Sequence, residues 1–578
     1  MPEESHKRSL STKEHATVQV LGAIHVVATL PFSSTSTSSS NDFNVESTRE
    51  IRRNGHSNIS ALPSKILAEI FLYAKDGVLR YGAPKEAGPL NVAGVCRDWR
   101  NIALASPQMW SFINLSRPDC ALELLKRSKS APLQIHCKSA PLTITAANEG
   151  IFKSIMAEVD RIKEIDVHAT AGSDILWLMS SNGGASAPLL EQLQLQNLES
   201  STTSLPLHVI SREMPSLRRL DLQNVSIPEL PHLPRLKHLT VSLSDRSAMP
   251  FSSLLSSLRH SPDLEEISIS GMLKNNLGDS PLHVKLPNLT RLAITSFDLE
   301  ASAIVANLEY PPSAEVAFRN KTPPSGEPDL SGVVKMCSRL LEPGAPALYS
   351  VKVHGFHPEG PCRMDVYASY RSYLGFGEDS EEYDNDSEDF SISLSIQERH
   401  YSAACVALCS ALPLETIHTL EVGGFDGMTK QQWKTIFRRC KRVEYIQCNS
   451  VPLSLFRTLV KSKSTKAPLL LPKLEAIEMT LCTFIEQENL AEPETSTSLA
   501  IFERFLRQRK SLKKPVGEVS LVMCQITPEA VETLEKYAPI CWDGEDTYYE
   551  EDEDDYDYNE EDGYDFDDLE GIYGLRFG

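Results

Sequence analysis

Hydrophobic residues between positions 62 and 113 recur with the period of an α-helix. The first run follows Pro63, whose missing N–H suits the first position of a helix, and comprises Ile66, Leu67, Ile70, Phe71 and Ala74. A second run comprises Val92, Val95, Cys96, Trp99, Ile102 and Ala103. Ser106 and Pro107 then form an N-cap and first-position pair before a short turn that carries Met109 and Trp110. The pattern predicts three small helices with a shared apolar core.

The two longer runs are separated by residues 75–88, which contain three glycines and a proline and therefore predict a loop. A helical unit of about 50 residues lies near the lower limit for an independent core. We therefore expect it to be a docking module that gains stability from a partner. The alternative is that its helices cap a larger domain.

A second pattern, the phrase L-x-x-L-x-L, recurs downstream. Copies begin at Ile162, Leu190, Leu217, Leu236, Leu264 and Leu289, and weaker copies begin at Leu348, Ile417, Val443, Leu474 and Val516. The first six copies are 28, 27, 19, 28 and 25 residues apart, close to the roughly 20–29 residues of a leucine-rich repeat. In such a unit the first apolar residue enters the core and the next two point inward from a short strand. The phrase therefore predicts a stack of short parallel strands.

Polar residues occupy the positions between the apolar ones and should face away from that core. In the first copies they are Glu191, Gln192, Gln194, Arg218, Arg219, Asp221, Lys237, His238 and Thr240. Together they form either a binding face or an ordinary solvated surface. Asn197 and Asn224 stand where an asparagine usually completes the repeat, but most copies lack it, which indicates a degenerate repeat.

Three segments resemble F-box proteins that are abundant in mushroom-forming fungi: LPSKILAEIFLYA, VCRDWRNIALASPQMWSFINL and SAPLQIHC. The resemblance covers about residues 60 to 540 and implies an α+β fold. It places a small helical F-box at residues 59–115 and an irregular leucine-rich-repeat α/β solenoid at 116–542. The chain departs from the family in the long separation of its first two helices and at Asn91, which interrupts the apolar run.

An F-box binds a Skp-type adaptor and, through it, the cullin scaffold of an SCF-type ubiquitin ligase. The resemblance implies that eight residues face this adaptor: Leu62, Pro63, Ile66, Leu67, Ile70, Leu90, Val95 and Cys96. It also implies an F-box core formed by Phe71, Trp99, Ile102 and Trp110. The expected function is a non-catalytic substrate receptor in ubiquitin-dependent degradation, with a target protein held by the repeats. The alternative is a leucine-rich-repeat scaffold without a ubiquitination role.

Acidic residues gather in two segments. Residues 543–578 hold 17 acidic side chains against one base, Arg576, and residues 378–389 hold 8 acidic side chains in 12 positions. We expect a disordered acidic tail, an extruded acidic loop, and disorder in residues 1–58, which include a serine-rich stretch. The tail either engages a basic partner or only solvates the chain. An acidic fold also argues against nucleic-acid binding.

No metal or disulfide pattern is present, because the twelve cysteines form no CxxC pair and lack matching histidines. We expect no cofactor, and we expect Cys405 and Cys409 to be buried small hydrophobes. Phosphate-loop, nucleophile-turn, HExxH and GxGxxG motifs are absent, so catalysis is not expected. An enzyme of unfamiliar type is the remaining alternative.

The apolar segment 18–30 is too short and too interrupted for a membrane span, and its long charged leader does not fit a signal peptide. A cytoplasmic or nuclear location is therefore expected. The basic run 504–514 is either a nuclear-import patch or the solvated face of the last helix. Its apolar side, Phe502, Phe505 and Leu506, favours the helix.

Overall fold

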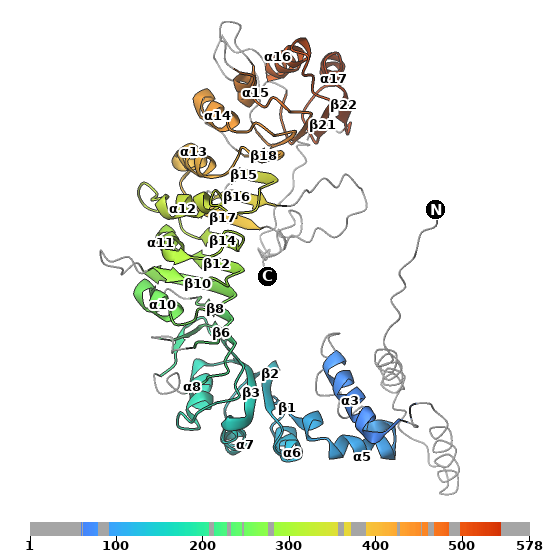
Figure 1. The fold of residues 1–578 in the computed structure, drawn as a ribbon, viewed down its shortest axis with the longest axis vertical. Helices are drawn as coiled ribbons and strands as arrows, with labels where there is room; N and C mark the ends of the chain where they lie inside the picture. Colours follow the sequence, from blue (N-terminus) through green and yellow to red (C-terminus); the bar gives the residue numbers. More distant parts are fainter. Residues whose placement is uncertain are drawn as a thin grey trace, which may run out of the picture. The chain divides into compact units, whose positions relative to one another are not determined.

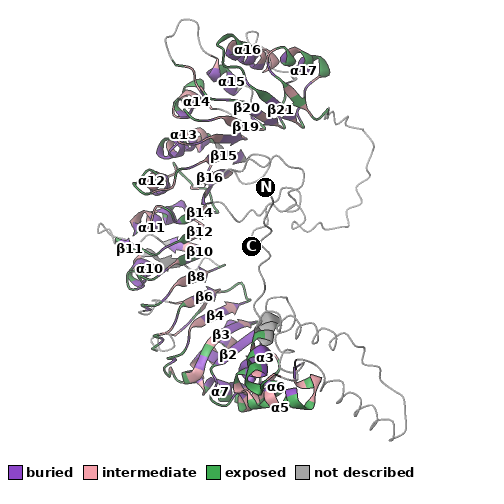
Figure 2. Cartoon of the chain, turned by 45° about the vertical axis from the view of Figure 1, so that its right-hand side comes forward, coloured by how far each residue is buried: buried purple, intermediate pink, exposed green. Residues whose placement is uncertain are grey.

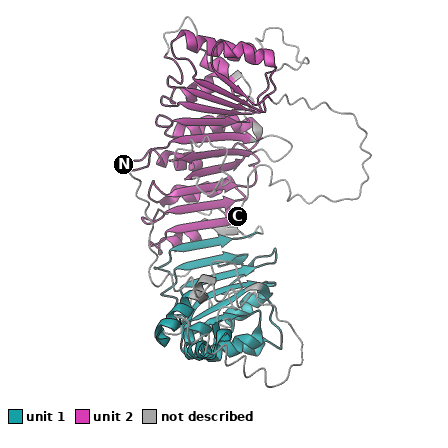
Figure 3. Ribbon diagram, turned by 90° about the vertical axis from the view of Figure 1, so that its right-hand side faces the viewer, with its two compact units in different colours: residues 1–245 teal, residues 246–578 magenta. Residues whose placement is uncertain are grey.

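The chain is a mixed α/β protein dominated by parallel strands, and its computed structural model divides into two compact units, residues 1–245 and 246–578 (Figure 3). The structure describes residues 59, 62–78, 92–206, 213–227, 233–244, 248–274, 283–356, 363–370, 389–424, 428–451, 454–460, 468–484 and 498–544. The predicted N-terminal disorder, Leu90 and Asn91, residues 378–388 of the acidic loop and the tail after residue 544 lie outside this range.

The described part of the first unit contains helical segments before its sheet, which include α3 (Ser64–Val78), residues 92–95, α5 (Arg97–Ala105) and the 3-10 helix η2 (Pro107–Trp110). The predicted single helix over residues 92–103 is wrong, because Cys96 adopts an extended conformation that interrupts it. The Cys96 thiol instead caps α5 by accepting a hydrogen bond from the Trp99 amide at 3.4 Å. The predicted loop also begins later than expected, since residues 75–78 belong to α3.

A parallel sheet follows, with its strands paired in chain order. Its strands are β1 (Phe112–Asn114), β2 (Leu133–Leu142), β3 (Ile162–Ala169), β4 (Gln192–Asn197), β6 (Arg219–Gln223) and β8 (His238–Ser242). The connecting segments include α6 (Pro118–Ser128), α7 (Glu149–Met156), η3 (Val159–Arg161), α8 (Gly172–Ser180) and the paired short strands β5 (Thr203–Ser204) and β7 (Val225–Ser226). The helices that follow β1 to β3 cover one face of the sheet (Figure 1).

The second unit repeats this arrangement of strands and returning helices. Its main strands are β9 (Ala248–Pro250), β10 (Glu266–Lys274), β12 (Arg291–Ser296), β14 (Glu315–Asn320), β15 (Ser350–Phe356), β16 (Arg363–Ser369), β17 (Phe390–Ser395), β18 (Thr419–Gly423), β19 (Tyr445–Asn449), β20 (Ala476–Thr480), β21 (Glu518–Val522) and β22 (Ile540–Trp542). A separate two-stranded pair comprises β11 (Val284–Lys285) and β13 (Leu308–Glu309).

The helices of the second unit lie along one face of its sheet, and consecutive helices from α11 to α17 pack against each other (Figure 1). They are α10 (Phe251–Leu258), η4 (Leu299–Ala301), α11 (Ser302–Asn307), α12 (Ser331–Arg339), η5 (Glu398–His400), α13 (Tyr401–Ala411), α14 (Lys430–Phe437), α15 (Ser454–Leu459), α16 (Ser498–Ser511) and α17 (Pro528–Glu535). The other face of the sheet is formed by strand side chains.

Strand order in the second unit departs from chain order at one place. The order there is β14–β17–β16–β15–β18, in which β16 is antiparallel to both of its neighbours and the remaining pairs are parallel. The three strands β15, β16 and β17 therefore enter the sheet as a reversed meander. The phrase at Leu348 predicted β15, whereas β16 and β17, which occupy the long gap before the phrase at Ile417, were not predicted.

Each of the eleven predicted phrases contains a strand, so the strand prediction is confirmed. The first apolar residue of every phrase is buried, from Ile162 in β3 to Val516 before β21. Along β4, β6 and β8 buried residues alternate with half-buried ones, as the period of two requires (Figure 2). Other parallel strands were missed, among them β14, because the position three residues before Val316, where the phrase requires a large apolar residue, is occupied by Ser313.

Four arginine side chains donate hydrogen bonds to backbone carbonyl oxygens of the strand–helix segment that precedes their own. Arg439, after α14, donates hydrogen bonds to the carbonyl oxygens of Cys409, Ser410 and Leu412, at 2.7 Å each. These carbonyls belong to the C-terminal end of α13, where the helix leaves them without an internal partner. Backbone carbonyls about 30 to 40 residues earlier are bound in the same way by Arg161, Arg339 and Arg509.

Asparagines perform a related role in the first unit. The Asn224 side chain donates to the carbonyl oxygens of Asn197 and Glu199, both at 3.1 Å, and accepts a hydrogen bond from the Ser244 amide at 2.8 Å. Asn197 is buried and donates to the Ser201 carbonyl at 2.8 Å. Each asparagine therefore satisfies backbone groups in the turns that follow the strands.

Two local predictions concern α16 and α13. Phe502, Phe505 and Leu506 are buried on α16, so the expected apolar side of the basic run is confirmed, although α17 follows and α16 is not the last helix. Arg509 is an exception within that run, because it is buried and desolvation lowers its pKa to about 10. Cys405 and Cys409 are buried within α13, as expected.

Candidate functional site

The helical segments of the first unit share a compact apolar core. The rings of Phe71 on α3 and Trp99 on α5 pack with centroids 4.8 Å apart. Trp110 on η2 donates its indole N–H to the Ala103 carbonyl at 2.8 Å. The buried members of this cluster are Leu67, Ile70, Phe71, Val92, Trp99, Ala103, Met109 and Trp110. We call this group of helices the helical module, and Ile102 packs half-buried against its core.

One side of α3 remains open to solvent and carries apolar groups. Ile66 is 40% exposed and Tyr73 is 60% exposed, and Pro63 lies exposed at the start of the helix. Apolar side chains on a helix surface of this kind are contact positions for another protein when they lie close together. Ile66 and Pro63 therefore form a candidate docking surface, which we call the α3 surface.

The packing corrects two of the expected adaptor contacts. Leu67 and Ile70 are only 4% and 6% exposed, because both side chains belong to the core of the helical module. Helical spacing identified the apolar residues of α3 but did not determine which of them α5 would cover. Leu62, Val95 and Cys96 are half-buried and pack against the same core, and Leu90 lies outside the described residues.

The strand side chains that point away from the helices form a second candidate surface. In the first unit the predicted outward residues are exposed or half-buried, including Gln192 and Gln194 on β4 and Arg219 and Asp221 on β6. The strand register places Gln192 beside Arg219 and Gln194 beside Asp221. A partner would meet rows of amides and charges held by a rigid sheet. We call these outward residues the strand face.

In the second unit the strand face contains a charged cluster around Glu421 on β18. The Glu421 carboxylate contacts the His354 imidazole at 2.7 Å and the Lys352 ammonium at 3.3 Å, both from β15. Burial acts to raise the pKa of Glu421, but the hydrogen bond from His354 and the charge of Lys352 outweigh it. The pKa of this carboxyl is therefore lowered, and Glu421 is ionised in the folded protein at neutral pH.

A neighbouring network connects β19 and β20. The Tyr445 hydroxyl donates to one oxygen of Glu478, and the Gln447 amide donates to the other at 2.9 Å. Burial raises the pKa of Tyr445, and the Glu478 carboxylate raises it further. The phenol is therefore a fixed hydrogen-bond donor and not an acid near neutral pH. Both networks hold their side chains in fixed orientations on the strand face.

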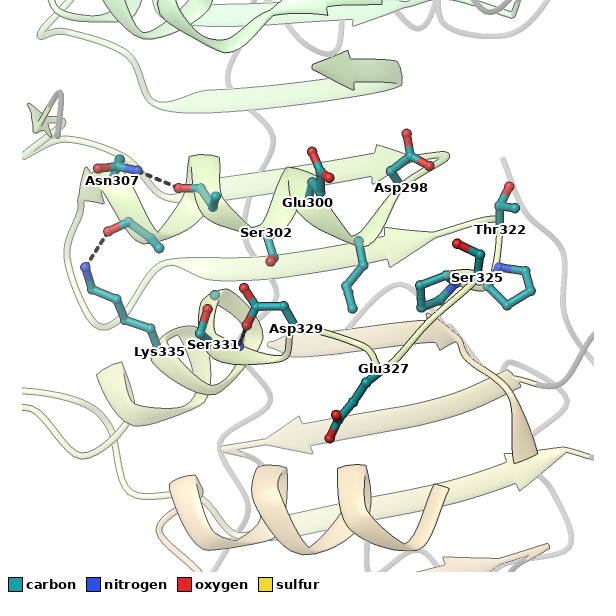
Figure 4. Close-up of a pocket in the computed structure, with 16 residues that line it drawn as sticks. Asp298, Glu300, Ser302, Asn307, Thr322, Ser325, Glu327, Asp329, Ser331 and Lys335 are labelled. Atoms are coloured by element: carbon teal, nitrogen blue, oxygen red, sulfur yellow. Dashed lines mark hydrogen bonds between the residues drawn. The ribbon is translucent and has the colours of Figure 1, made fainter. Parts of the chain in front are cut away.

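A cleft of about 660 Å³ lies on the helical side of the second unit, between η4, α11 and the start of α12 (Figure 4). Its lining includes four carboxylates, Asp298, Glu300, Glu327 and Asp329. Its one lysine, Lys335, donates to the Ala306 carbonyl at 2.6 Å. Hydrogen bonds from Ser331, one of them from its backbone amide at 2.9 Å, lower the pKa of Asp329. The cleft is an acidic, open depression.

Thiol chemistry is not favoured at three of the buried cysteines. Burial raises the pKa of Cys337, Cys440 and Cys448, in the case of Cys448 to about 12. Because the thiolate is the nucleophilic form, these groups are unreactive at neutral pH. They act as small apolar residues in the core.

Among the described helices, none has the length and apolar composition required to cross a lipid bilayer.

No protein-family model matches the chain, and no curated protein matches it significantly. The geometry of the described residues alone defines the candidate site, through three features. They are the α3 surface of the helical module, the strand face, and the acidic cleft of the second unit. Sequence patterns predicted the first two, whereas the cleft is formed by residues that carry no motif.

Proposed function

We propose that the chain is the substrate-receptor subunit of an SCF-type ubiquitin ligase. In this proposal the helical module is an F-box whose α3 surface binds a Skp-type adaptor and, through it, a cullin scaffold. The strand units are degenerate leucine-rich repeats that bind a target protein. The chain itself performs no catalytic step and acts by bringing the target close to the ubiquitin-conjugating enzyme.

The α3 surface is the observation that carries the adaptor assignment. The helical module buries its aromatic residues internally, yet it leaves Ile66 exposed beside Pro63 at the start of α3. A module of this size has few apolar residues to spare for its surface. Their exposure is accounted for if a partner covers them. The opening Leu-Pro pair also stands where the F-box resemblance places its adaptor contact.

The geometry of the strands supports the repeat assignment. Parallel strands recur with the L-x-x-L-x-L phrase, and the returning segments lie on one side of the sheet. Asn224 hydrogen-bonds to the adjacent turn, as a ladder of repeat asparagines would. The strand face offers charges and amides in fixed positions, which suits recognition of a protein surface.

A reducing compartment, the cytoplasm or nucleus, fits this proposal. The described cysteines are free, and most of them are buried within the core. The acidic cleft of the second unit is a secondary candidate for target binding. Nothing in this assignment requires a cofactor.

Co-expression of the full chain with a Skp-type adaptor from a mushroom-forming fungus tests the proposal. We expect the two proteins to elute together from size-exclusion chromatography at equimolar ratio. If the full chain is folded and elutes without the adaptor, the assignment as a ligase receptor is contradicted. The alternative of a repeat scaffold without a ubiquitination role would then be favoured.

A further inference from the structure

A histidine and two carboxylates meet on the strand face of the first unit. His136 lies on β2, and Glu164 and Asp166 lie on β3. The parallel register places His136 directly beside Asp166, and Gln134 beside Glu164. Because alternate strand residues share a face, the three side chains point to the same side of the sheet.

His136 is held rigidly and is nearly inaccessible. It is only 4% exposed, and its ring stacks on Phe112 of β1 with centroids 4.4 Å apart and planes inclined by 16°. Neither ring nitrogen makes a hydrogen bond. A buried imidazole in this condition is unusual, because leaving a buried donor or acceptor unsatisfied costs free energy. The two nitrogens therefore require another explanation.

Both nitrogens point toward carboxylates at distances too long for hydrogen bonds. Nε2 lies 3.6 Å from Oε1 of Glu164, and Nδ1 lies 3.7 Å from Oδ2 of Asp166. One ligand atom from each of the three residues lies within 4.8 Å of the other two. Two ligand atoms that each lie about 2.1 Å from a shared ion are at most about 4.2 Å apart, so the carboxylates close in by about half an ångström when one ring nitrogen and both carboxylates bind the same ion.

Gln134, at the edge of the cluster, hydrogen-bonds to the Glu164 carboxylate. Its amide donates to Oε2 of Glu164 at 3.1 Å and thereby orients that carboxylate toward His136. Metal-binding carboxylates are commonly oriented by such an outer hydrogen bond. Asp166 is almost completely buried, and a second imidazole, that of His168, lies 3.7 Å from its other oxygen, Oδ1.

We propose that His136, Glu164 and Asp166 form a binding site for a divalent transition-metal ion, with Zn²⁺ the best match. A neutral imidazole and two carboxylates are ligands that Zn²⁺ accepts at about 2.0–2.2 Å, whereas Ca²⁺ and Mg²⁺ favour oxygen ligands alone. The charge of the ion balances the two carboxylates. Three protein ligands leave a fourth position for water or for a side chain of a bound protein. The site is independent of the proposed role of the helical module.

The competing explanation is that a protonated His136 holds the two carboxylates by charge alone. Titration of the metal-depleted full chain with Zn²⁺ by isothermal calorimetry separates the two explanations. Cys120 and Cys541, the exposed cysteines of the described residues, are replaced by serine in every sample so that their thiols do not bind the ion. The same titration is made with Glu164→Gln, which can still accept the hydrogen bond from Gln134, and with His136→Gln.

The matched control is His238→Gln, because His238 lies on β8 of the same strand face but outside the cluster. We expect one Zn²⁺ per chain in the parent protein and in His238→Gln. Binding should be at least about tenfold weaker in Glu164→Gln and His136→Gln. Zn²⁺ should raise the unfolding temperature of the parent but not of these two variants.

Absence of a stoichiometric Zn²⁺ site in the parent would overturn the proposal, and so would unchanged affinity in a folded Glu164→Gln variant. The visible absorption spectrum of bound Co²⁺ is a second test, and it uses only the parent protein, so it does not require any variant to fold. The parent should give the visible absorption of four-coordinate Co²⁺ without a thiolate charge-transfer band. A spectrum of hexahydrated Co²⁺ in the presence of the parent protein would contradict the site.

Discussion

Phe71 and Trp99 pack with their ring centroids 4.8 Å apart and their planes inclined by 49°, and this contact joins α3 to α5. It determines which side of α3 turns inward. Leu67 and Ile70 follow Phe71 into the core, and Ile66 is left on the outside. The α3 surface, on which the proposed adaptor binding depends, is therefore a consequence of this aromatic pair.

Replacing Phe71 with alanine should destabilise the helical module by about 3–5 kcal/mol, because the side chain is fully buried and would leave a cavity. Urea unfolding followed by tryptophan fluorescence measures the change. Tyr73→Ala, two residues further along the same helix, is the control. Its side chain is exposed, so the free energy of unfolding should change by about 0.5 kcal/mol or less. Equal losses in the two variants would contradict the described core.

Arg439→Met should lower the free energy of unfolding by about 2–3 kcal/mol, because three carbonyl oxygens at the end of α13 would lose their donor. Chemical denaturation measures the loss. The neighbouring variant Arg438→Met is a matched control, since Arg438 is exposed. A similar stability of the two variants would show that the arginine contacts between successive segments contribute little.

Gly424→Ala should be strongly destabilising. Gly424 has a φ of +63°, and an added Cβ would lie 1.7 Å from the carbonyl oxygen of Gly355 at the end of β15. The two causes of destabilisation are the positive φ and the steric clash of the added Cβ, and Gly544→Ala separates them. Gly544 also has a positive φ, of +76°, but an added Cβ meets no atom within 4 Å. Positive φ alone costs alanine about 1–2 kcal/mol. The unfolding temperature should therefore fall further for Gly424→Ala, and equal falls would contradict the close approach of β15.

The lowered pKa of Glu421 predicts a pH dependence of stability. A carboxyl with a lower pKa in the folded state stabilises the protein above its unfolded pKa of about 4.3, and this contribution is lost as the pH falls through the folded value. We therefore expect the wild type to lose more stability than Glu421→Gln between about pH 5 and pH 3. Unfolding free energies across this range measure the difference. An equally steep loss in the variant would contradict the lowered pKa.

The strands could be predicted from sequence because their determinants are local. In the phrase from Leu217, for example, Leu217, Leu220 and Leu222 are all buried, and the strand β6 begins two residues after the first leucine. Where the first position of the phrase is polar, as at Ser313 before β14, the local signal fails although the strand forms. The strand β14 then depends on pairing with β12 and β17.

Features that depend on long-range pairing could not be predicted. Antiparallel β16 joins β15 to β17, and no periodicity distinguishes its direction from that of a parallel strand. Similarly, Ile66 and Ile70 have the same chemistry and both lie on the apolar stripe of α3. Only the position of α5 decides that Ile70 is covered and Ile66 is not.

The His136 cluster illustrates the same limit for a site. His136 and Asp166 are 30 residues apart and form no metal-ligand motif, so the sequence predicted no metal ligand. The parallel register of β2 and β3 brings them together. His136 precedes the first recognised phrase, at Ile162, so a comparison of outward positions between phrases did not include it.

The affinity of the purified full chain for a Skp-type adaptor tests the central claim most directly. It should be measured for the wild type, for Ile66→Asp and for Leu189→Asp, whose leucine is similarly exposed at 45% but lies between α8 and β4, outside the helical module. Ile66 is preferred to Ile70, because a charge at the buried Ile70 would disrupt the module itself. We predict tight binding by the wild type and Leu189→Asp and at least about tenfold weaker binding by a folded Ile66→Asp. No binding by the wild type, or equal affinity of all three proteins, would contradict the proposed α3 surface.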